Sequence, residues 1–236
     1  MKEPKRQAES QRPKLDVARM QPDLPLGDAV FRVLRRALQD GVWRPGDRLR
    51  EEEVARELNV SRTPVREALG RLQSKRLIEP GGAKGLVVRA LDLGEILELY
   101  AMREILEGAA ASLAAQHASS SEIDSLADIN AAFRKPEIDA AEMARLNRLF
   151  HDTIVRAARN RYLQIALEEL QDGIALLGDT TFSIAGRGAT AHDEHHAILA
   201  AIAARKAEAA GEAARTHIRE ALRQRLKLSQ GVELAR

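Results

Sequence analysis

The second half of the chain holds side chains whose types and spacing suit a metal ion. Asn147 and His151 are four residues apart, so on a helix they would share one face. His195 and His217 each fall on a stripe of small or apolar residues, as His151 does. Neutral imidazole is a common ligand of zinc and related ions. Three imidazoles and one oxygen would leave one position open for water or a ligand.

Spacing alone leaves other interpretations open. The histidines could be unrelated core or surface residues. His192 and His196 also form a pair four residues apart. Spacing therefore does not choose between His195 and His196 as the ligand from this segment.

Arg103 is a candidate for binding an anion. Its expected helix has an apolar seam, and Arg103 lies off that seam: Leu99, Met102, Leu106, Ala109 and Leu113. Arg103 lies on a second face, which is also largely apolar: Ile96, Tyr100, Ala110 and Ala114. A guanidinium that points into the protein needs an anion, and a carboxylate fits its fork. The alternative is an ordinary pair with Glu107, four residues on, worth only ~0.3–0.5 kcal/mol when exposed.

A different chemistry is indicated between Leu58 and Leu72, which reads L-N-V-S-R-T-P-V-R-E-A-L-G-R-L. We expect one helix to close at Asn59-Val60, and Ser61 to cap the next through its hydroxyl. Pro64 falls in the first turn, where its missing N–H is tolerated. Three apolar residues at helical spacing would face a core: Val65, Leu69 and Leu72.

That arrangement leaves Arg62, Thr63 and Arg66 exposed at the start of the second helix. In a helix-turn-helix, this end of the recognition helix meets base edges in the major groove of DNA. Arginine there can bind guanine O6 and N7 through two hydrogen bonds. The spacing therefore predicts a DNA-reading helix.

The elements expected around this helix form a small N-terminal domain, residues 25–90. They are a helix at 26–38, a short strand at 48–49, a helix at 51–58, the recognition helix to about Lys75, and a strand–hairpin–strand wing over 77–89. Lys84 lies at the wing tip, where it could meet a groove or a phosphate. Residues 1–24 are polar with poor periodicity and are expected to form a flexible arm.

Residues 91–236 are expected to be helical throughout, near 93–117, 121–132, 138–158, 161–177, 191–204 and 206–229. Breaks fall at Lys135-Pro136 and over Gly186–Gly188. The predicted fold class is mostly α: an N-terminal winged helix-turn-helix followed by an all-α antiparallel helical bundle.

Composition agrees with this division. Aromatic residues make up 3% of the 236 residues and there is no cysteine, which excludes a disulfide framework and a thiolate metal site. Residues 25–90 hold 14 Lys/Arg against 9 Asp/Glu, whereas residues 91–236 hold 17 against 22. A basic module joined to an acidic one suits nucleic acid on one side only. No apolar run could span a membrane, so we expect a cytoplasmic protein.

The run from Leu26 to Arg89, and above all V-S-R-T-P-V-R-E-A-L, resembles the GntR family of bacterial transcription regulators. The resemblance implies that Arg62, Thr63 and Arg66 contact operator DNA, together with the wing. We add Arg50, Ser61 and Lys84 to the predicted DNA-binding set. Many relatives carry a DNA-contacting arginine at the place of Glu52. Glu52 would instead repel phosphate, and Arg50 is expected to compensate in part.

The helical half resembles the FCD ligand-binding domain of the FadR-type GntR subfamily. Its metal motif falls on Asn147, His151, His195 and His217, and the resemblance implies a divalent metal, zinc above nickel or manganese. Asn147 departs from the usual aspartate and brings no charge. Relatives use the place of Arg103 to hold an acidic effector near the metal, and we expect Phe182 to line the same pocket.

The resulting hypothesis is a homodimeric transcription regulator and not an enzyme. Two winged domains would read two half-sites of a palindromic operator, and a small carboxylate effector would relieve repression. One alternative is a metal-dependent hydrolase fused to a DNA-targeting module. It lacks a clear general base, because Asp193 and Glu194 are expected to face away from the site. Another alternative keeps the DNA module and an organic anion but has no metal.

Overall fold

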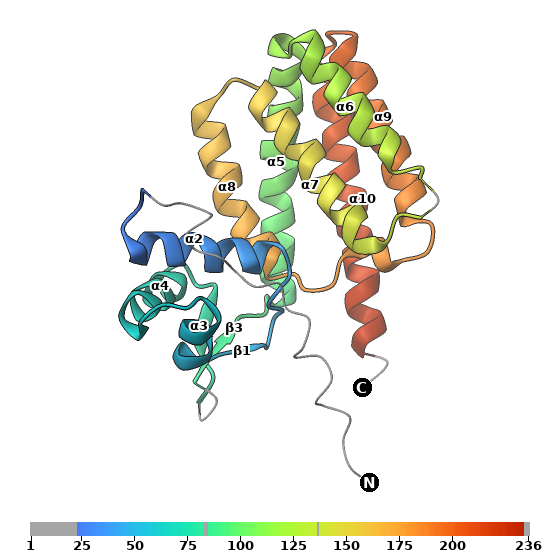
Figure 1. The fold of residues 1–236 in the computed structure, drawn as a ribbon. Helices are drawn as coiled ribbons and strands as arrows, with labels where there is room; N and C mark the ends of the chain where they lie inside the picture. The colour runs from blue at the N-terminus through green and yellow to red at the C-terminus, as the bar shows by residue number, and fades with distance from the viewer. Residues whose placement is uncertain (1–22, 83–84, 136, 234–236) are drawn as a thin grey trace. The chain divides into compact units, whose positions relative to one another are not determined.

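The structure, a computed structural model, describes residues 23–82, 85–135 and 137–233. Most of the expected arm and the wing-tip Lys84 lie outside the described residues. Helices and strands follow the order α2 (Leu26–Gln39), β1 (Arg48–Leu49), α3 (Glu51–Glu57), α4 (Arg62–Ser74), β2 (Ile78–Pro80), β3 (Leu86–Val88), α5 (Leu93–His117), α6 (Ser120–Ala132), α7 (Ala140–Ala157), α8 (Arg161–Ala175), η2 (Thr181–Ser183), α9 (Arg187–Ala203) and α10 (Ala207–Glu233) (Figure 1).

The chain forms two compact units. The first contains the described part of Met1–Leu91 together with Gln171–Gly178, and the second contains Asp92–Leu170 and the described residues from Asp179 onward. The predicted fold class is confirmed, since a winged helix-turn-helix is followed by a helical domain.

In the first unit, α2 and α4 meet across an apolar core that includes Val30 and Leu34 from α2 and Val65 and Leu72 from α4. The three short strands pair antiparallel in the order β1-β3-β2, with Arg48 opposite Val87. The wing therefore joins the core through its buried Ile78 and Val88.

The start of α4 differs from the expectation in one detail. Ser61 occupies the N-cap position with an extended backbone, but its side chain makes no capping hydrogen bond. A capping hydroxyl accepts from the N–H of the second or third helical residue. Pro64 is the third residue of α4 and has no N–H, so one of the two donors is missing. The predicted cap through the Ser61 hydroxyl is therefore wrong.

The last turn of α8 belongs to the first unit. Leu176 is buried in the same core as α2 and α4. Asp172 is also buried, and it accepts hydrogen bonds from Arg35 Nε at 2.6 Å and Gln39 Nε2 at 3.0 Å. An acidic side chain in this position is stabilised by these donors.

In the second unit, α5, α7 and α9 supply one continuous core with α10. The starts of α5 and α6 carry capping boxes, Asp92 with Glu95 and Ser119 with Glu122. Each box satisfies two backbone N–H groups at the helix start. The two helices begin at Leu93 and Ser120, within one residue of the predicted starts at 93 and 121.

Two expectations for this unit are wrong. Helix α9 begins at Arg187, so Gly188 lies inside the helix and only Gly186, with φ +80°, forms the break. A Cβ at Gly188 would lie 2.7 Å from Met143 Sδ, so a larger residue there would require the Met143 side chain to move. On α5, Met102 from the expected core seam is 45% exposed, whereas Arg103 is 8% exposed. The inward face of α5 is the one that carries Arg103.

Candidate DNA-binding surface and histidine centre

Three histidines from different helices meet inside the helical domain. His151 on α7, His195 on α9 and His217 on α10 are all buried, and one nitrogen of each lies within 4.8 Å of the others. The Nε2 atoms of His151 and His217 are 3.1 Å apart. His196, the competing candidate from the same segment, is exposed. The arrangement brings together the donor atoms of a three-imidazole metal site.

Two glutamates contact the Nδ1 atoms of His151 and His217. His151 Nδ1 lies 2.8 Å from Glu107 Oε2, and His217 Nδ1 lies 2.6 Å from Glu194 Oε2. Glu194 accepts the Nδ1 proton of His217, so the Nε2 lone pair of that ring is left facing the centre, while Glu107 lies at ion-pair distance from His151. Glu194 was expected to face away from the site, and that expectation is wrong.

His195 is fully buried, and neither of its ring nitrogens has a hydrogen-bond partner among the described residues. Its ring stacks on Phe150 at 4.2 Å between centroids and meets the edge of Phe133 at 5.1 Å. A buried polar group without a partner costs about 1–3 kcal/mol. A metal ion bound by one nitrogen would offset that cost, so the residues present fit the ion that the sequence predicts.

Each glutamate is held in turn by a buried arginine. Arg103 donates from Nε to Glu107 Oε1 at 2.8 Å, and Arg187 donates from Nη1 and Nη2 to Glu194, both at 2.9 Å. Two chains of arginine, glutamate and histidine therefore converge on the centre. Arg103 is buried and pairs with Glu107, which is the partner named in the second alternative, and its role in binding an effector stays a prediction.

Burial favours the neutral form of two imidazoles, those of His195 and His217. It lowers the pKa of His217 to about 4, with the charge of His151 acting in the same direction and Glu194 opposing it. Burial also lowers the pKa of His195 well below its usual value. For Glu107, burial alone would raise the pKa, but Arg103 and His151 outweigh it and hold the pKa well below the usual range. Neutral imidazole is the form that binds metal.

The other two predicted residues of this domain, Asn147 and Phe182, lie on α7 and in η2. Asn147 is half-buried on α7, one helical turn before His151. Phe182, in η2, lies 5.8 Å from Phe133 between ring centroids, and Phe133 contacts His195. Phe182 is therefore connected to the histidine centre through the ring of Phe133. Arg187 was not predicted, and Glu107 was predicted only as an alternative partner of Arg103 and not as a neighbour of His151.

The start of α4 is exposed, as a DNA-reading helix requires. The side chains of Arg62 and Arg66 are 56% and 69% exposed, and Thr63 and Ser61 are also exposed. Arg50, at the start of α3, is exposed and pairs with Glu53 at 2.6 Å. This surface carries the side chains that could reach a major groove.

Acids of α3 contact both recognition-helix arginines. Glu51 Oε1 accepts from Arg62 Nε and from Arg66 Nη2, each at 2.9 Å, and Glu52 accepts from Arg62 Nη1 at 3.0 Å. The hydrogen bonds from Arg66 and Arg62 lower the pKa of the Glu51 carboxyl. The sequence did not predict these pairs.

Comparison with known proteins decides the family. Residues 26–88 match the family of bacterial regulatory proteins called gntR, and residues 98–220 match the FCD domain. The chain is 32% identical over 190 residues to the Nta operon transcriptional regulator of Aminobacter aminovorans, covering 80% of this chain and 89% of that protein. The chain belongs to the GntR family.

Other comparisons agree with this assignment. The HTH-type transcriptional repressor GlaR of Escherichia coli (strain K12) is 28% identical over 199 residues, which cover 80% of this chain and 90% of that protein. The fold of E. coli McbR/YncC matches with a TM-score of 0.75 at 23% identity, over 87% of this chain and 99% of that chain. This GntR protein is a DNA-binding transcription regulator and not an enzyme. Within the described residues, none of the helices has the length and apolar character needed to cross a membrane.

Proposed function

We propose that this GntR regulator is a homodimeric repressor that contains a metal ion and acts in the cytoplasm. It would bind a palindromic operator, and a small organic acid would release it from that DNA. His151, His195 and His217 would hold a divalent metal, zinc above nickel or manganese, with Asn147 as an oxygen ligand. The observation that carries the proposal is the meeting of these three buried histidines, whose nitrogens lie within 4.8 Å of one another.

The charges around the centre favour an anionic effector. Glu107 and Glu194 balance Arg103 and Arg187, and the three imidazoles and Asn147 bring no charge in the form that binds metal. A divalent ion would then leave a buried net charge of about +2, and a buried charge needs a partner. A carboxylate bound to the metal, with Arg103 nearby, would supply it.

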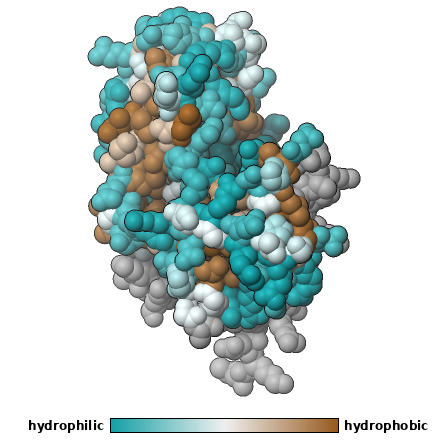
Figure 2. Space-filling model, turned by 90° about the vertical axis from the view of Figure 1, so that its left-hand side faces the viewer, coloured by the Kyte–Doolittle hydropathy of each residue, from teal (hydrophilic) through white to brown (hydrophobic). Residues whose placement is uncertain are grey.

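Exposed apolar side chains support the homodimer. On α5, Leu97 and Ile105 are 43% and 60% exposed, and on α8, Tyr162 and Ile165 are 80% and 56% exposed. Figure 2, which looks from the side that carries α8, shows hydrophobic residues gathered on the helical domain. Apolar patches of this kind mark protein interfaces, and a two-fold dimer would also place two winged domains on two half-sites.

The first test concerns metal and effector. A duplex of about 30 base pairs would be selected from a randomised pool by the zinc-loaded protein, and its release by small hydroxy acids and sugar acids followed by fluorescence anisotropy. We expect one acid to release the duplex only when zinc is present. Zinc at 100 times its Kd should add about 2.7 kcal/mol of stability, a melting shift of about 5–10 °C.

The matched variants are His195→Ala and His196→Ala, which are neighbours on α9. His195 lies in the histidine centre, and His196 is exposed at the surface. His195→Ala should abolish both the zinc-dependent melting shift and the release of DNA, whereas His196→Ala should keep both. A zinc shift that survives in His195→Ala would support the alternative without a metal at this site.

The second test concerns DNA. Arg62→Ala with Arg66→Ala should weaken binding of the selected duplex at least tenfold, since each guanine contact is worth about 1–3 kcal/mol. The control removes two exposed charges from the helical domain, Arg161→Ala with Arg223→Ala, and should change binding less than threefold. Equal losses in the two double variants would contradict the proposed reading surface.

A further inference from the structure

The arginines of the recognition helix form ion pairs with two acidic residues of α3. Arg62 donates from Nε to Glu51 and from Nη1 to Glu52, while Arg66 donates from Nε and Nη2 to Glu51. These four side chains line a surface hollow bounded by α3, α4 and the wing strands, which also includes Arg48, Gln73 and Leu86. The DNA-reading groups are therefore bound to carboxylates that DNA must accommodate or displace.

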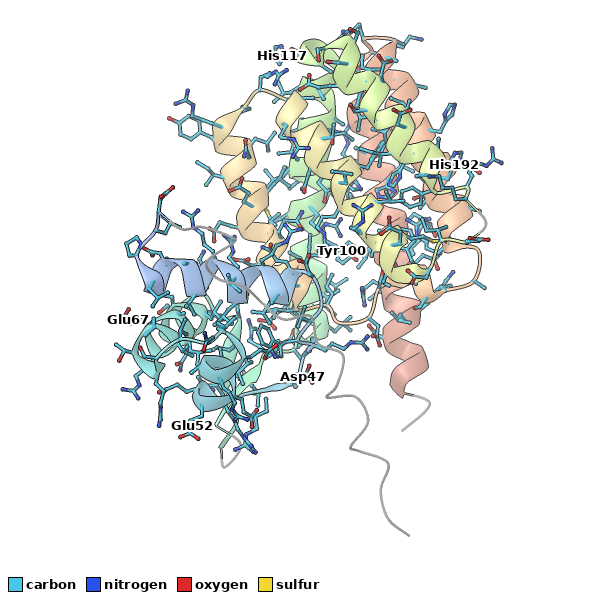
Figure 3. The ribbon with its side chains drawn as sticks, viewed as in Figure 1. Asp47, Glu52, Glu67, Tyr100, His117 and His192 are labelled. Carbon is cyan, nitrogen blue, oxygen red and sulfur yellow. The ribbon has the colours of Figure 1, made fainter. Side chains whose placement is uncertain are left out.

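The two carboxylates differ in how firmly they are held. Glu51 is 22% exposed and bridges both arginines through three hydrogen bonds. Glu52 is 69% exposed, makes one contact at 3.0 Å, and projects from α3 at the surface (Figure 3). Glu51 fixes the position of both guanidinium groups, whereas Glu52 is an exchangeable partner of Arg62 alone.

We propose that Glu52 is a positioning residue, which competes with DNA for Arg62 and so weakens every DNA contact that this arginine makes. The inference rests on DNA binding by the GntR domain and not on the metal or the effector.

The physical reason lies in what each kind of DNA offers to Arg62. Phosphates are present on every duplex, and binding to them depends on net positive charge. Glu52 cancels about one charge at this end of α4 and occupies Nη1, so contact with a phosphate requires the carboxylate to be displaced. A guanine edge offers two acceptors to the guanidinium, but Arg62 must leave Glu52 for that contact as well. Glu52 therefore penalises contact of Arg62 with a base edge and with a phosphate alike.

The test measures binding of Glu52→Gln to two duplexes by fluorescence anisotropy: the duplex selected by the wild-type protein and a shuffled duplex of the same composition. We expect affinity for the selected duplex to rise about fivefold, the upper limit of what an exposed ion pair is worth. The shuffled duplex should gain no more than that. For the shuffled duplex, the slope of log Kd against log salt should steepen by about 0.9, as one more phosphate contact requires.

Two controls separate this role from simple repulsion. Glu57→Gln makes the same charge change elsewhere on α3 and should leave both affinities within twofold. In an Arg62→Ala background, Glu52→Gln should also change the selected-duplex affinity less than twofold, because Glu52 is proposed to act through Arg62. An equal fivefold gain with and without Arg62, or no gain in the single variant, would overturn the inference. Matching melting curves would show that the exposed substitutions leave the fold intact.

Discussion

Arg62 at the DNA surface and Arg103 in the helical domain each donate a hydrogen bond from Nε to a glutamate. Arg62 Nε lies 2.9 Å from Glu51, and Arg103 Nε lies 2.8 Å from Glu107. Their surroundings differ, since the Arg62 side chain is 56% exposed and the Arg103 side chain 9%. Water screens the first pair and leaves it worth at most about 1 kcal/mol, whereas breaking the second leaves an uncompensated buried charge.

This difference matches what each region has to do. At the DNA surface an arginine must exchange a carboxylate for a base edge or a phosphate, so a weak pair is useful. In the histidine centre the arginine must keep a glutamate in place beside His151. Exposed pairs therefore permit a change of partner, and buried pairs fix geometry.

The strongest test of the comparison is Glu107→Leu. The change leaves Arg103 buried without its anion and removes the partner of His151, so the free energy of unfolding should fall by about 3–5 kcal/mol. Urea unfolding of the metal-free protein would measure it. Arg103→Met combined with Glu107→Leu should recover much of that loss, because no charge is then left unpaired. A single-variant loss below 1 kcal/mol would mean that this pair behaves like an exposed one.

A smaller effect is expected from pH, in protein kept metal-free with a chelator. His217 has a pKa of about 4 when folded and 6.5 as the ordinary value, so between these values the unfolded chain binds a proton that the folded chain does not. Stability must therefore fall as pH decreases from 6.5 to 4, by up to ~1.4 kcal/mol per pH unit for this group. Denaturant unfolding across that range would measure the slope.

The control for the pH effect is His217→Gln, which removes the titrating ring and leaves Glu194 paired with Arg187. Its stability should depend less on pH over the same range than that of the wild type. His195 contributes in the same direction, so some slope should remain. A wild-type slope of opposite sign, or one unchanged in the variant, would contradict the assignment to His217.

The two regions also differ in how well sequence could predict them. The DNA-reading end of α4 follows from one local string, in which Pro64 and the spacing of Val65, Leu69 and Leu72 place the arginines outside. The structure brings His151, His195 and His217 together, but the choice of His195 over His196 needed the family motif. Helical spacing fitted either residue equally well.

The partners of these residues could not be predicted, because they depend on packing between helices. Glu107 and Glu194 look like ordinary helix-surface acids in the sequence. Helix α5 is apolar on two faces, so periodicity selected the side of Met102 while tertiary packing buried the side of Arg103. The pairing of Asp172 with Arg35 links positions 137 residues apart, and no local pattern records it.

The smallest expected effect on stability is that of Glu51→Gln at the DNA surface. Glu51 makes three hydrogen bonds to arginines, more than Glu107 makes to Arg103, yet the arginines it holds are exposed. Since solvent replaces lost partners there, the free energy of unfolding should change by less than about 1 kcal/mol. Affinity for the selected duplex should nevertheless fall severalfold, because both reading arginines lose their fixed position. Urea unfolding and anisotropy on the same preparation would measure the two effects. A stability loss as large as that of Glu107→Leu would show that burial does not separate the two regions, and that the number of hydrogen bonds alone determines the strength of these pairs.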